Sequence, residues 1–212
     1  MSTIRVESNA FYGLLNEVKG FASENKHTPG LCSVQFEFAP TFLRLTATDR
    51  YKVLLGRINY EGEEGSGARH VPADTPKAVF PLAEIKAVLA TLRAKELHKR
   101  GGSRMLEFES NEVGRWDVFT EDGIITALRE IPYMDSLPDF TNMFHEPEGD
   151  CLRLRLGLFA KSSKNIDVLF DPHQSKRQPL LLVPSKTSQL DITGLIQPVA
   201  ETISTKDPAI TA

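Results

Sequence analysis

The sequence predicts an α+β protein made of three successive units, each with a strand, a helix and further strands. Two amphipathic helical stretches are each preceded by a short alternating run and followed by two or three more such runs. After residue 150, a third group of alternating runs surrounds a shorter helical stretch. Only the order of the elements repeats, because the three segments share negligible identity. With 212 residues, the chain is long enough to bury a sizeable core.

The first unit spans about residues 1–65. A strand is expected at 3–7, a helix from its N-cap Asn9 to residue 26, and strands at 32–39 and 42–60. The helix carries one apolar stripe: Phe11, Leu14, Leu15, Val18, Phe21 and Ala22. An acidic, glycine-rich loop at 61–70 closes the unit.

The second unit spans about residues 70–135, so that the first two units form one complete domain over 1–135. We expect a strand at 77–80, a helix at 81–99 that starts near Pro81, and strands at 104–110, 115–122 and 124–131. A linker follows at 136–150. The third unit, 151–200, has expected strands at 151–156, 166–170, 178–184 and 192–199, with a short helix at 157–165. The tail, 201–212, is polar and expected to be loose.

Positive charge is concentrated in the second helix and the turn after it. From Leu82 to Arg104 there are six basic residues and two glutamates, although the whole chain has a net charge of −3. Two interpretations remain open. A solvated helix face is the plain one, and a surface that contacts the phosphates of duplex DNA is the other. Single-stranded nucleic acid is disfavoured because no aromatic side chains interleave with the charges.

No pattern in the sequence indicates an enzyme, a metal site or a membrane protein. The five histidines lack ligand spacing, and no nucleophile elbow, P-loop or dinucleotide-binding motif is present. The two cysteines, Cys32 and Cys151, are expected to be reduced thiols. No apolar run approaches membrane-spanning length. We therefore expect a cytoplasmic protein without catalytic residues, metal or cofactor. A metal-dependent nuclease or hydrolase that uses Asp49 is the enzymatic alternative.

Four segments together resemble the beta sliding clamps of bacterial DNA polymerase III, which some phages also encode. "TATDRYKVL" at 46–54 is similar to the family's "ATDGHRLA", and "VFPLAEIKAVLATL" at 79–92 is similar to its strand-to-helix segment. "DSLPDFTNMF" at 135–144 and "GLIQPV" at 194–199 are similar to the end of its middle domain and to its C-terminal strand. The resemblance implies the DNA-clamp fold, here a short, phage-type version with the middle domain and the second half of the last.

The resemblance also implies a cleft that binds an extended peptide of a partner protein. "ATDRYK" would then be a strand lining the cleft rather than a hairpin turn. The residues that match the family's cleft are Thr48, Tyr51, Lys52, Val53, Pro138, Met143, Leu195, Gln197 and Pro198. This chain has Gln197 where the family usually has methionine and Ala200 where it usually has arginine, which predicts a shallower or more polar pocket.

In clamps of this family, helices line a ring that encircles duplex DNA, and sheets form its outside. The expected DNA-facing residues are Lys19, Lys86, Arg93, Lys95, Lys99, Arg100, Lys161 and Lys164. A DNA polymerase and a clamp loader are the implied partners. Because the ring contains twelve units, closure with three units per chain implies a head-to-tail tetramer, or a trimer if the third unit counts as a full domain. The alternative is an adaptor or decoy that keeps the cleft without encircling DNA.

Overall fold

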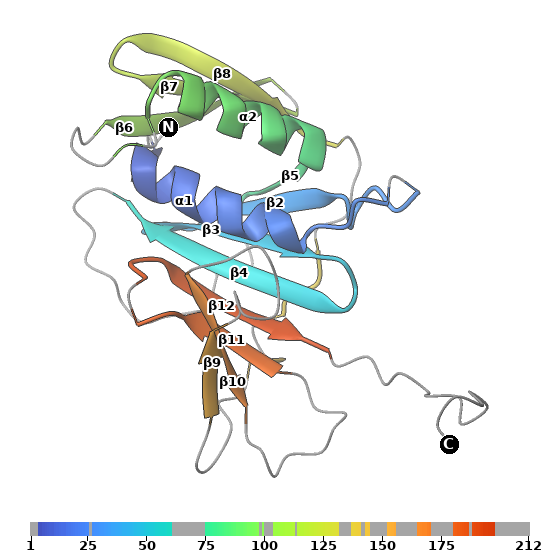
Figure 1. Ribbon diagram of the computed structural model, residues 1–212. Coiled ribbons are helices and arrows are strands. Elements are labelled where there is room, and N and C mark those ends of the chain that lie inside the picture. The colour runs from blue at the N-terminus through green and yellow to red at the C-terminus, as the bar shows by residue number, and fades with distance from the viewer. Residues whose placement is uncertain are drawn as a thin grey trace, which may run out of the picture.

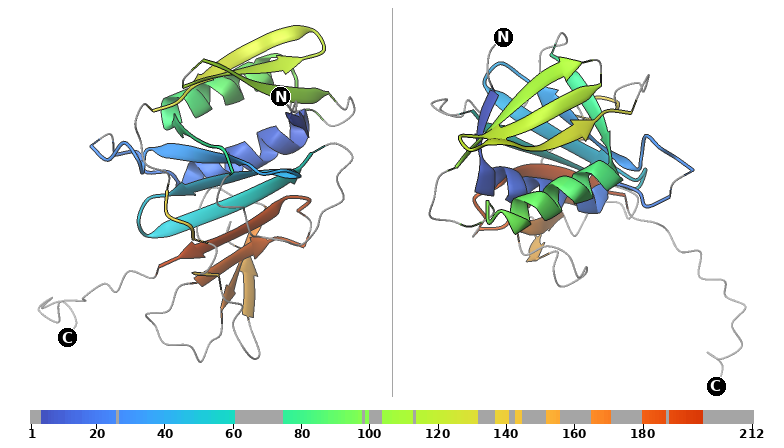
Figure 2. Two further views of the ribbon diagram at one scale, coloured as in Figure 1. Left: turned by 180° about the vertical axis from the view of Figure 1, so that it is seen from behind. Right: turned by 90° about the horizontal axis from the view of Figure 1, so that it is seen from above.

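The computed structural model describes residues 4–25, 27–60, 75–97, 99, 104–112, 114–131, 137–140, 143–144, 152–155, 165–170, 180–186 and 188–197. Two antiparallel sheets and two long helices make up this part of the chain (Figure 1). The helices lie side by side on one face of the molecule, and the sheets lie behind them (Figure 2). The α+β class expected from the sequence is confirmed.

The first unit contains β1 (Ile4–Glu7), α1 (Ser8–Val18), the short 3-10 helix η1 (Lys19–Phe21), β2 (Ser33–Phe38), β3 (Phe42–Thr48) and β4 (Lys52–Asn59). The second contains β5 (Lys77–Pro81), α2 (Leu82–Ala94), β6 (Met105–Glu112), β7 (Arg115–Thr120) and β8 (Gly123–Arg129). The two units exchange their first strands. β1 pairs with β6 of the second unit, and β5 pairs with β2 of the first, both antiparallel. This reciprocity ties the two units together through both sheets.

The third group of strands extends the sheet of the first unit. It contains β9 (Leu152–Arg155), β10 (Ile166–Phe170), β11 (Leu180–Pro184) and β12 (Asp191–Ile196). β12 lies antiparallel against β4, so one sheet has the order β5-β2-β3-β4-β12-β11-β10-β9. The other sheet has the order β1-β6-β7-β8.

Aromatic side chains join the two sheets beneath the helices. Phe11 of α1 packs edge-on against Phe36 of β2 and Phe108 of β6, with ring centroids 6.0 and 5.2 Å apart. Phe38 of β2 stacks on Trp116 of β7 at 4.1 Å. Edge-on and stacked pairs add about 0.5–1.5 kcal/mol each beyond their burial. The apolar stripes of α1 and α2 are therefore fixed in one shared core.

The helix boundaries differ from those expected. Helix α1 begins at Ser8, so Glu7 rather than Asn9 holds the N-cap position, and the α-helix ends at Val18 before a 3-10 turn. Helix α2 ends at Ala94, well before residue 99. The expected loop at 61–70, the tail at 201–212 and all of the expected third helix at 157–165 except Asn165 lie outside the described residues.

The close approach of β12 to β4 gives a direct test of this arrangement. A Cβ atom at Gly194 would lie 2.5 Å from the carbonyl oxygen of Val53, which is backbone and cannot move aside easily. We expect Gly194→Ala to lower the free energy of unfolding by about 1–3 kcal/mol, measured by urea denaturation.

Gly13→Ala on α1 is the matched control, because its Cβ would meet only Leu190 Cδ2 at 3.5 Å, an ordinary contact. Alanine also favours a helix over glycine by about 1 kcal/mol, so this variant should be at least as stable as the parent. Equal stability of the two variants would contradict the close β4–β12 approach.

Candidate functional site

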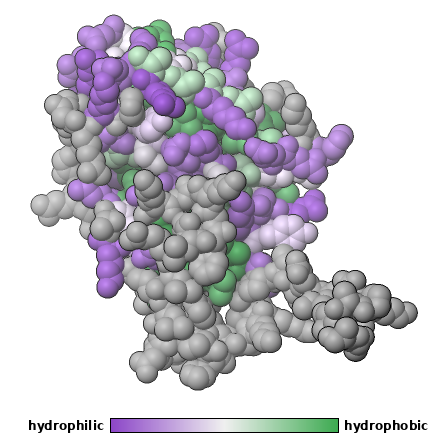
Figure 3. Space-filling model, viewed as in Figure 1, coloured by the Kyte–Doolittle hydropathy of each residue, from purple (hydrophilic) through white to green (hydrophobic). Residues whose placement is uncertain are grey.

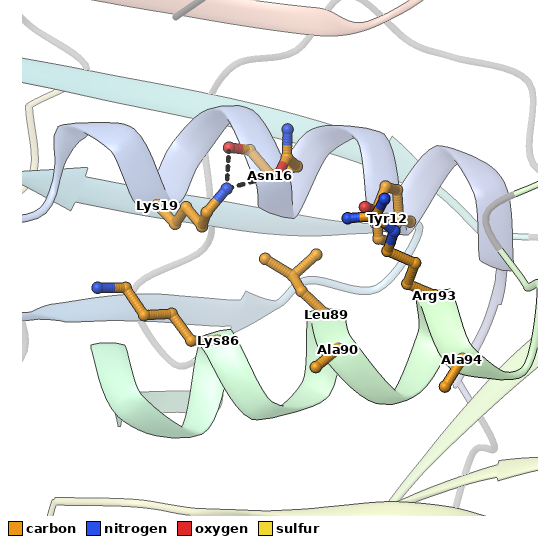
Figure 4. A pocket seen from close by; sticks show the side chains of 8 residues that line it. All are labelled: Tyr12, Asn16, Lys19, Lys86, Leu89, Ala90, Arg93 and Ala94. Carbon is orange, nitrogen blue, oxygen red and sulfur yellow. Dashed lines mark hydrogen bonds between the residues drawn. The ribbon is translucent and has the colours of Figure 1, made fainter.

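A cleft between the two long helices gathers three of the basic residues singled out in the sequence. Lys19 lies just after α1, and Lys86 and Arg93 lie on α2. The cleft has a volume of about 520 Å³, and its other lining residues are Tyr12, Asn16, Leu89, Ala90 and Ala94 (Figure 4). On the same face of the molecule, hydrophilic side chains surround a smaller apolar area (Figure 3). The helix pair thus offers a basic rim over an apolar floor.

The electrostatics of this cleft favour an anion. Burial lowers the pKa of the Lys19 ammonium, and the charge of Lys86 lowers it further, while Glu17 opposes both effects. Lys19 Nζ donates hydrogen bonds to the side-chain and main-chain oxygens of Asn16 at 2.5 and 3.2 Å. Because burial is the main effect that disfavours the charged form of Lys19, a phosphate bound beside its ammonium would stabilise that charge.

The other expected DNA-facing residues are more dispersed. Lys95 occupies the C-cap position of α2, and Lys99 lies beyond it with its Nζ 2.5 Å from Glu96 Oε1. Lys86 also has a weak partner, Glu24, at 3.6 Å. Arg100, Lys161 and Lys164 lie outside the described residues. The helix pair therefore brings Lys19, Lys86 and Arg93 together, with Lys95 and Lys99 continuing from the end of α2.

A second, smaller cleft of about 80 Å³ lies where β12 meets the β3–β4 turn. Seven residues of the predicted peptide cleft line it: Thr48, Tyr51, Lys52, Val53, Met143, Leu195 and Gln197. Pro138 is exposed nearby but does not line it, and Pro198 lies outside the described residues. Arg50 and Phe140 also line the cleft and were not expected. Both lie inside the motif segments 46–54 and 135–144, which was the signal in the sequence that could have identified them.

The segment Asp49–Tyr51 is a turn, which corrects the expectation that "ATDRYK" forms a strand. β3 ends at Thr48 and β4 begins at Lys52. Asp49 Oδ1 accepts hydrogen bonds from the backbone N–H groups of Tyr51 and Lys52 at 3.1 and 3.0 Å. The short aspartate side chain thus replaces the Asn-Gly signal of a common hairpin by bonding its own backbone.

This turn holds one residue in an unfavourable backbone conformation. Arg50 has φ of +85°, in the left-handed region that favours glycine. The Thr48 hydroxyl stabilises the turn by donating to the Lys52 carbonyl at 2.8 Å and accepting from the Arg50 N–H at 3.3 Å. As a result, Tyr51 is 60% exposed at the rim of the cleft.

The opposite wall is carried by residues 137–140 and 143–144, and buried polar groups of the sheet anchor the first of these two segments. The Leu137 N–H donates to Gln35 Oε1 at 2.5 Å, and Arg44 Nη2 lies 3.7 Å from Asp139 Oδ1. Arg44 is itself buried and ion-paired with Glu37. Phe140 and Phe144 pack against the apolar cluster Val53, Leu181 and Leu195. The cleft therefore has an apolar base with fixed walls.

Lys52 contributes to the cleft in a different way from the other lining residues. Its ammonium donates to the Gly20 carbonyl at 2.8 Å and lies 5.2 Å from the centre of the Phe21 ring. The charge is thus directed toward the end of α1, and the β3–β4 turn is tied to the helix. We infer that Lys52 positions the turn rather than binding a peptide carboxylate.

Within the described part of the chain, no group of three or more histidine, cysteine, aspartate or glutamate side chains is arranged to hold a metal ion. None of the helices found there is long and apolar enough to cross a membrane.

Comparison with known proteins places the fold. No protein-family model and no curated protein matches the sequence. Solved structures do match. The DNA polymerase III beta subunit of Thermotoga maritima aligns with a TM-score of 0.62 at 14% identity, over 93% of this chain and 65% of that one. The DNA polymerase sliding clamp of Bacillus subtilis aligns with a TM-score of 0.62 at 11% identity, over 93% of this chain and 64% of that one. The DNA polymerase III beta chain of Streptococcus pneumoniae aligns with a TM-score of 0.63 at 14% identity, over 94% of this chain and 65% of that one.

The chain thus has the fold of the DNA sliding clamps. More particularly, its fold is that of DNA polymerase III beta subunits, as the four sequence segments indicated. It spans just under two thirds of the length of these structures.

The strained turn at the cleft provides a test of its geometry. Because a non-glycine residue in the left-handed region costs about 1 kcal/mol or more, we expect Arg50→Gly to raise stability by roughly 0.5–1 kcal/mol. Thermal and urea unfolding would measure the gain. Lys95→Gly at the α2 C-cap, where φ is −86°, is the control and should bring no gain. Destabilisation by Arg50→Gly would contradict the positive φ.

Proposed function

We propose that this protein is a DNA sliding clamp, a processivity factor that encircles duplex DNA and tethers a DNA polymerase through a peptide-binding cleft. The observation that carries the proposal is the pair α1 and α2, which in the clamp fold places Lys19, Lys86 and Arg93 around one cleft on the helical face. A basic helical face on this fold is suited to contact phosphates without reading bases.

The action we propose is topological and requires no chemical step in this chain. Contacts of lysine and arginine with phosphates are weak and interchangeable, so the protein can move along the duplex. Encirclement prevents dissociation while those contacts exchange. Three units per chain and a twelve-unit ring require four copies, a homotetramer. A clamp loader would open the ring, and any nucleotide hydrolysis would belong to that partner.

The cleft at the β3–β4 turn would hold the partner's peptide. Its apolar base of Val53, Leu181 and Leu195 suits an apolar anchor side chain. Exposed Tyr51 and Met143 form part of the rim, and Arg50 adds a positive charge. An extended peptide with an apolar anchor and a nearby acidic group would complement these features.

Encirclement can be tested without a loader by threading the protein onto linear duplex DNA. The protein is mixed with open-ended DNA, the ends are then blocked with biotin and streptavidin, and retention is measured after a wash at high salt. A ring should be retained when it is added before the ends are blocked and lost when it is added afterward. Equal retention in the two orders would contradict encirclement.

The same DNA tests the basic cleft. We expect Lys86→Gln with Arg93→Gln to weaken salt-sensitive DNA binding and to reduce the slope of log K against log salt by roughly 2, because two phosphate contacts are lost. The matched control is Arg5→Gln with Arg115→Gln, which removes two exposed charges from the first and third strands of the β1–β8 sheet. Equal slopes for both double variants would remove the DNA-facing assignment.

The peptide cleft makes a separate prediction. Leu195→Ala removes a side chain from the apolar base and should weaken binding of a polymerase-derived peptide by about 1–2 kcal/mol, measured by calorimetry. Leu169→Ala, which removes the same side chain from the margin of that cluster, is the control for general loosening of the sheet. Full-strength binding by Leu195→Ala would mean that the cleft is misplaced.

A non-encircling adaptor or decoy is the second candidate. The chain spans under two thirds of the compared clamps yet carries both walls of the cleft, a combination that would serve an adaptor equally well. Peptide binding without order-dependent retention on blocked DNA would favour it.

A further inference from the structure

The cleft between α1 and α2 has features that contact with a DNA backbone does not use. Its volume, about 520 Å³, is in the range of pockets that hold small molecules. Its floor is apolar and is formed by buried Leu89 with Ala90 and Ala94, and half-buried Tyr12 lines the same space. The phosphates of duplex DNA lie on its outside and its bases are stacked inside. A duplex therefore needs the cationic rim of the cleft, but neither its floor nor its aromatic ring.

The cationic groups of the cleft lie at its two ends. Lys19 and Lys86 lie at one end, whereas Arg93 extends from α2 toward Tyr12 at the other (Figure 4). Residues 86 and 93 are seven positions apart on one helix, which corresponds to about 10 Å along its axis. Leu89 lies between the two ends. The cleft thus combines an end with two lysines, an apolar middle and an end with an aromatic ring.

The end with two lysines is suited to a phosphate group. Burial is the main cause of the lowered pKa of Lys19, and Glu17 raises this pKa while Lys86 lowers it, so the two ammonium groups are within electrostatic reach of each other. Asn16 accepts a hydrogen bond from Lys19 Nζ, and its NH2 group can donate to a phosphate oxygen. The ion pair of Lys86 with Glu24 is exposed and weak, so a phosphate can displace it.

The other end is suited to a flat ring. Tyr12 supplies an aromatic surface on which a base can stack, and such stacking tolerates any base. The guanidinium of Arg93 is planar and can also stack on a ring. Leu89 and Ala90 provide the apolar surface between the two ends, where a sugar would lie. A nucleotide has matching parts in the same order, which are its base, its sugar and its phosphates.

We propose that the cleft between α1 and α2 binds a nucleoside diphosphate or triphosphate, with its base toward Tyr12 and its phosphates toward Lys19 and Lys86. A bound nucleotide occupies the cations that the proposed function assigns to DNA, so nucleotide and duplex DNA compete for the cleft. This competition rests on the proposed function, whereas the binding of the nucleotide itself does not.

Calorimetric titration with ADP tests the site. In metal-free buffer at low salt, we expect one ADP to bind per chain, roughly fivefold or more tighter than pyrophosphate, because stacking of the base adds to the phosphate contacts. Tyr12→Leu should remove this preference by weakening the binding of ADP while leaving that of pyrophosphate unchanged. Absence of saturable ADP binding, or equal affinity of the parent protein for ADP and pyrophosphate, would overturn the proposal.

Two double variants test where the phosphates bind. Lys19→Gln with Lys86→Gln removes both ammonium groups of the cleft and should weaken ADP binding roughly fivefold or more. The matched control is Lys95→Gln with Lys99→Gln, which removes two exposed cations that follow α2 and do not line the cleft. This control should keep its affinity for ADP within about twofold, because salt and solvent screen more distant charges. Equal losses in the two variants would mean that ADP responds only to overall charge, and the proposed site would be wrong.

A competition experiment separates this inference from the proposed function. ADP is added to the protein bound to open-ended duplex DNA, and sodium chloride of equal ionic strength is the control. Greater release by ADP than by the salt supports a shared cleft, and simultaneous binding of ADP and DNA would overturn the competition. Binding of DNA without binding of ADP would overturn the nucleotide site and leave the proposed function standing. Binding of ADP without binding of DNA would support the nucleotide site while the proposed function fails.

Discussion

The antiparallel pairing of β4 with β12 is the interaction on which the rest of the structure depends. It joins the third group of strands to the first unit through six paired positions, from Ile196–Lys52 to Asp191–Arg57. Gly194 permits the close approach, since a side chain there would strike the Val53 carbonyl. Arg57 Nε reinforces the far end with an ion pair to Asp191 Oδ2 at 2.8 Å. The smaller cleft exists because this junction brings Leu195 and Gln197 beside the β3–β4 turn.

A buried charge cluster gives the cleft its second wall. Glu37 is fully buried, and its negative charge is met by Arg44 and, at 3.4 Å, by Lys77 Nζ. A buried ion pair contributes little net stability. Removing one partner is nevertheless destabilising, because the other charge is left buried and unpaired in a medium that solvates it poorly. Here the cluster also orients Arg44 toward Asp139, so that residues 137–140 are held against the sheet. The buried charges of Glu37 and Arg44 thus shape one wall of the smaller cleft on the surface.

The helical face follows from burial of apolar area. Both helices place their leucines, phenylalanines and valines on the shared core, and their polar residues remain outward together. Cations from two helices then share one cleft, where burial lowers the pKa of Lys19.

The sequence by itself determined the elements and the class. Periodicity located the starts of both long helices and nearly every described strand to within a few residues, because apolar side chains must recur at the spacing of the face they bury. Both helices end earlier than expected. The four motif segments indicated the clamp fold and seven residues that line the cleft. Local sequence signals did not predict the start of the first helix or the turn between β3 and β4 correctly. Asn9 resembled a cap, although the helix starts at Ser8, and "TDRYK" lacked a glycine, although Asp49 closes a turn there.

Only the tertiary structure decided which of these residues act together. Periodicity reports which side of an element is buried, but not which other element covers it. Nothing local in the sequence places Lys19 beside Lys86, or directs the Lys52 ammonium to Gly20, since those contacts depend on packing between distant segments. The partner of β12 is likewise a property of strand order. Strand order is set by long-range pairing, which composition and spacing along the chain do not encode locally.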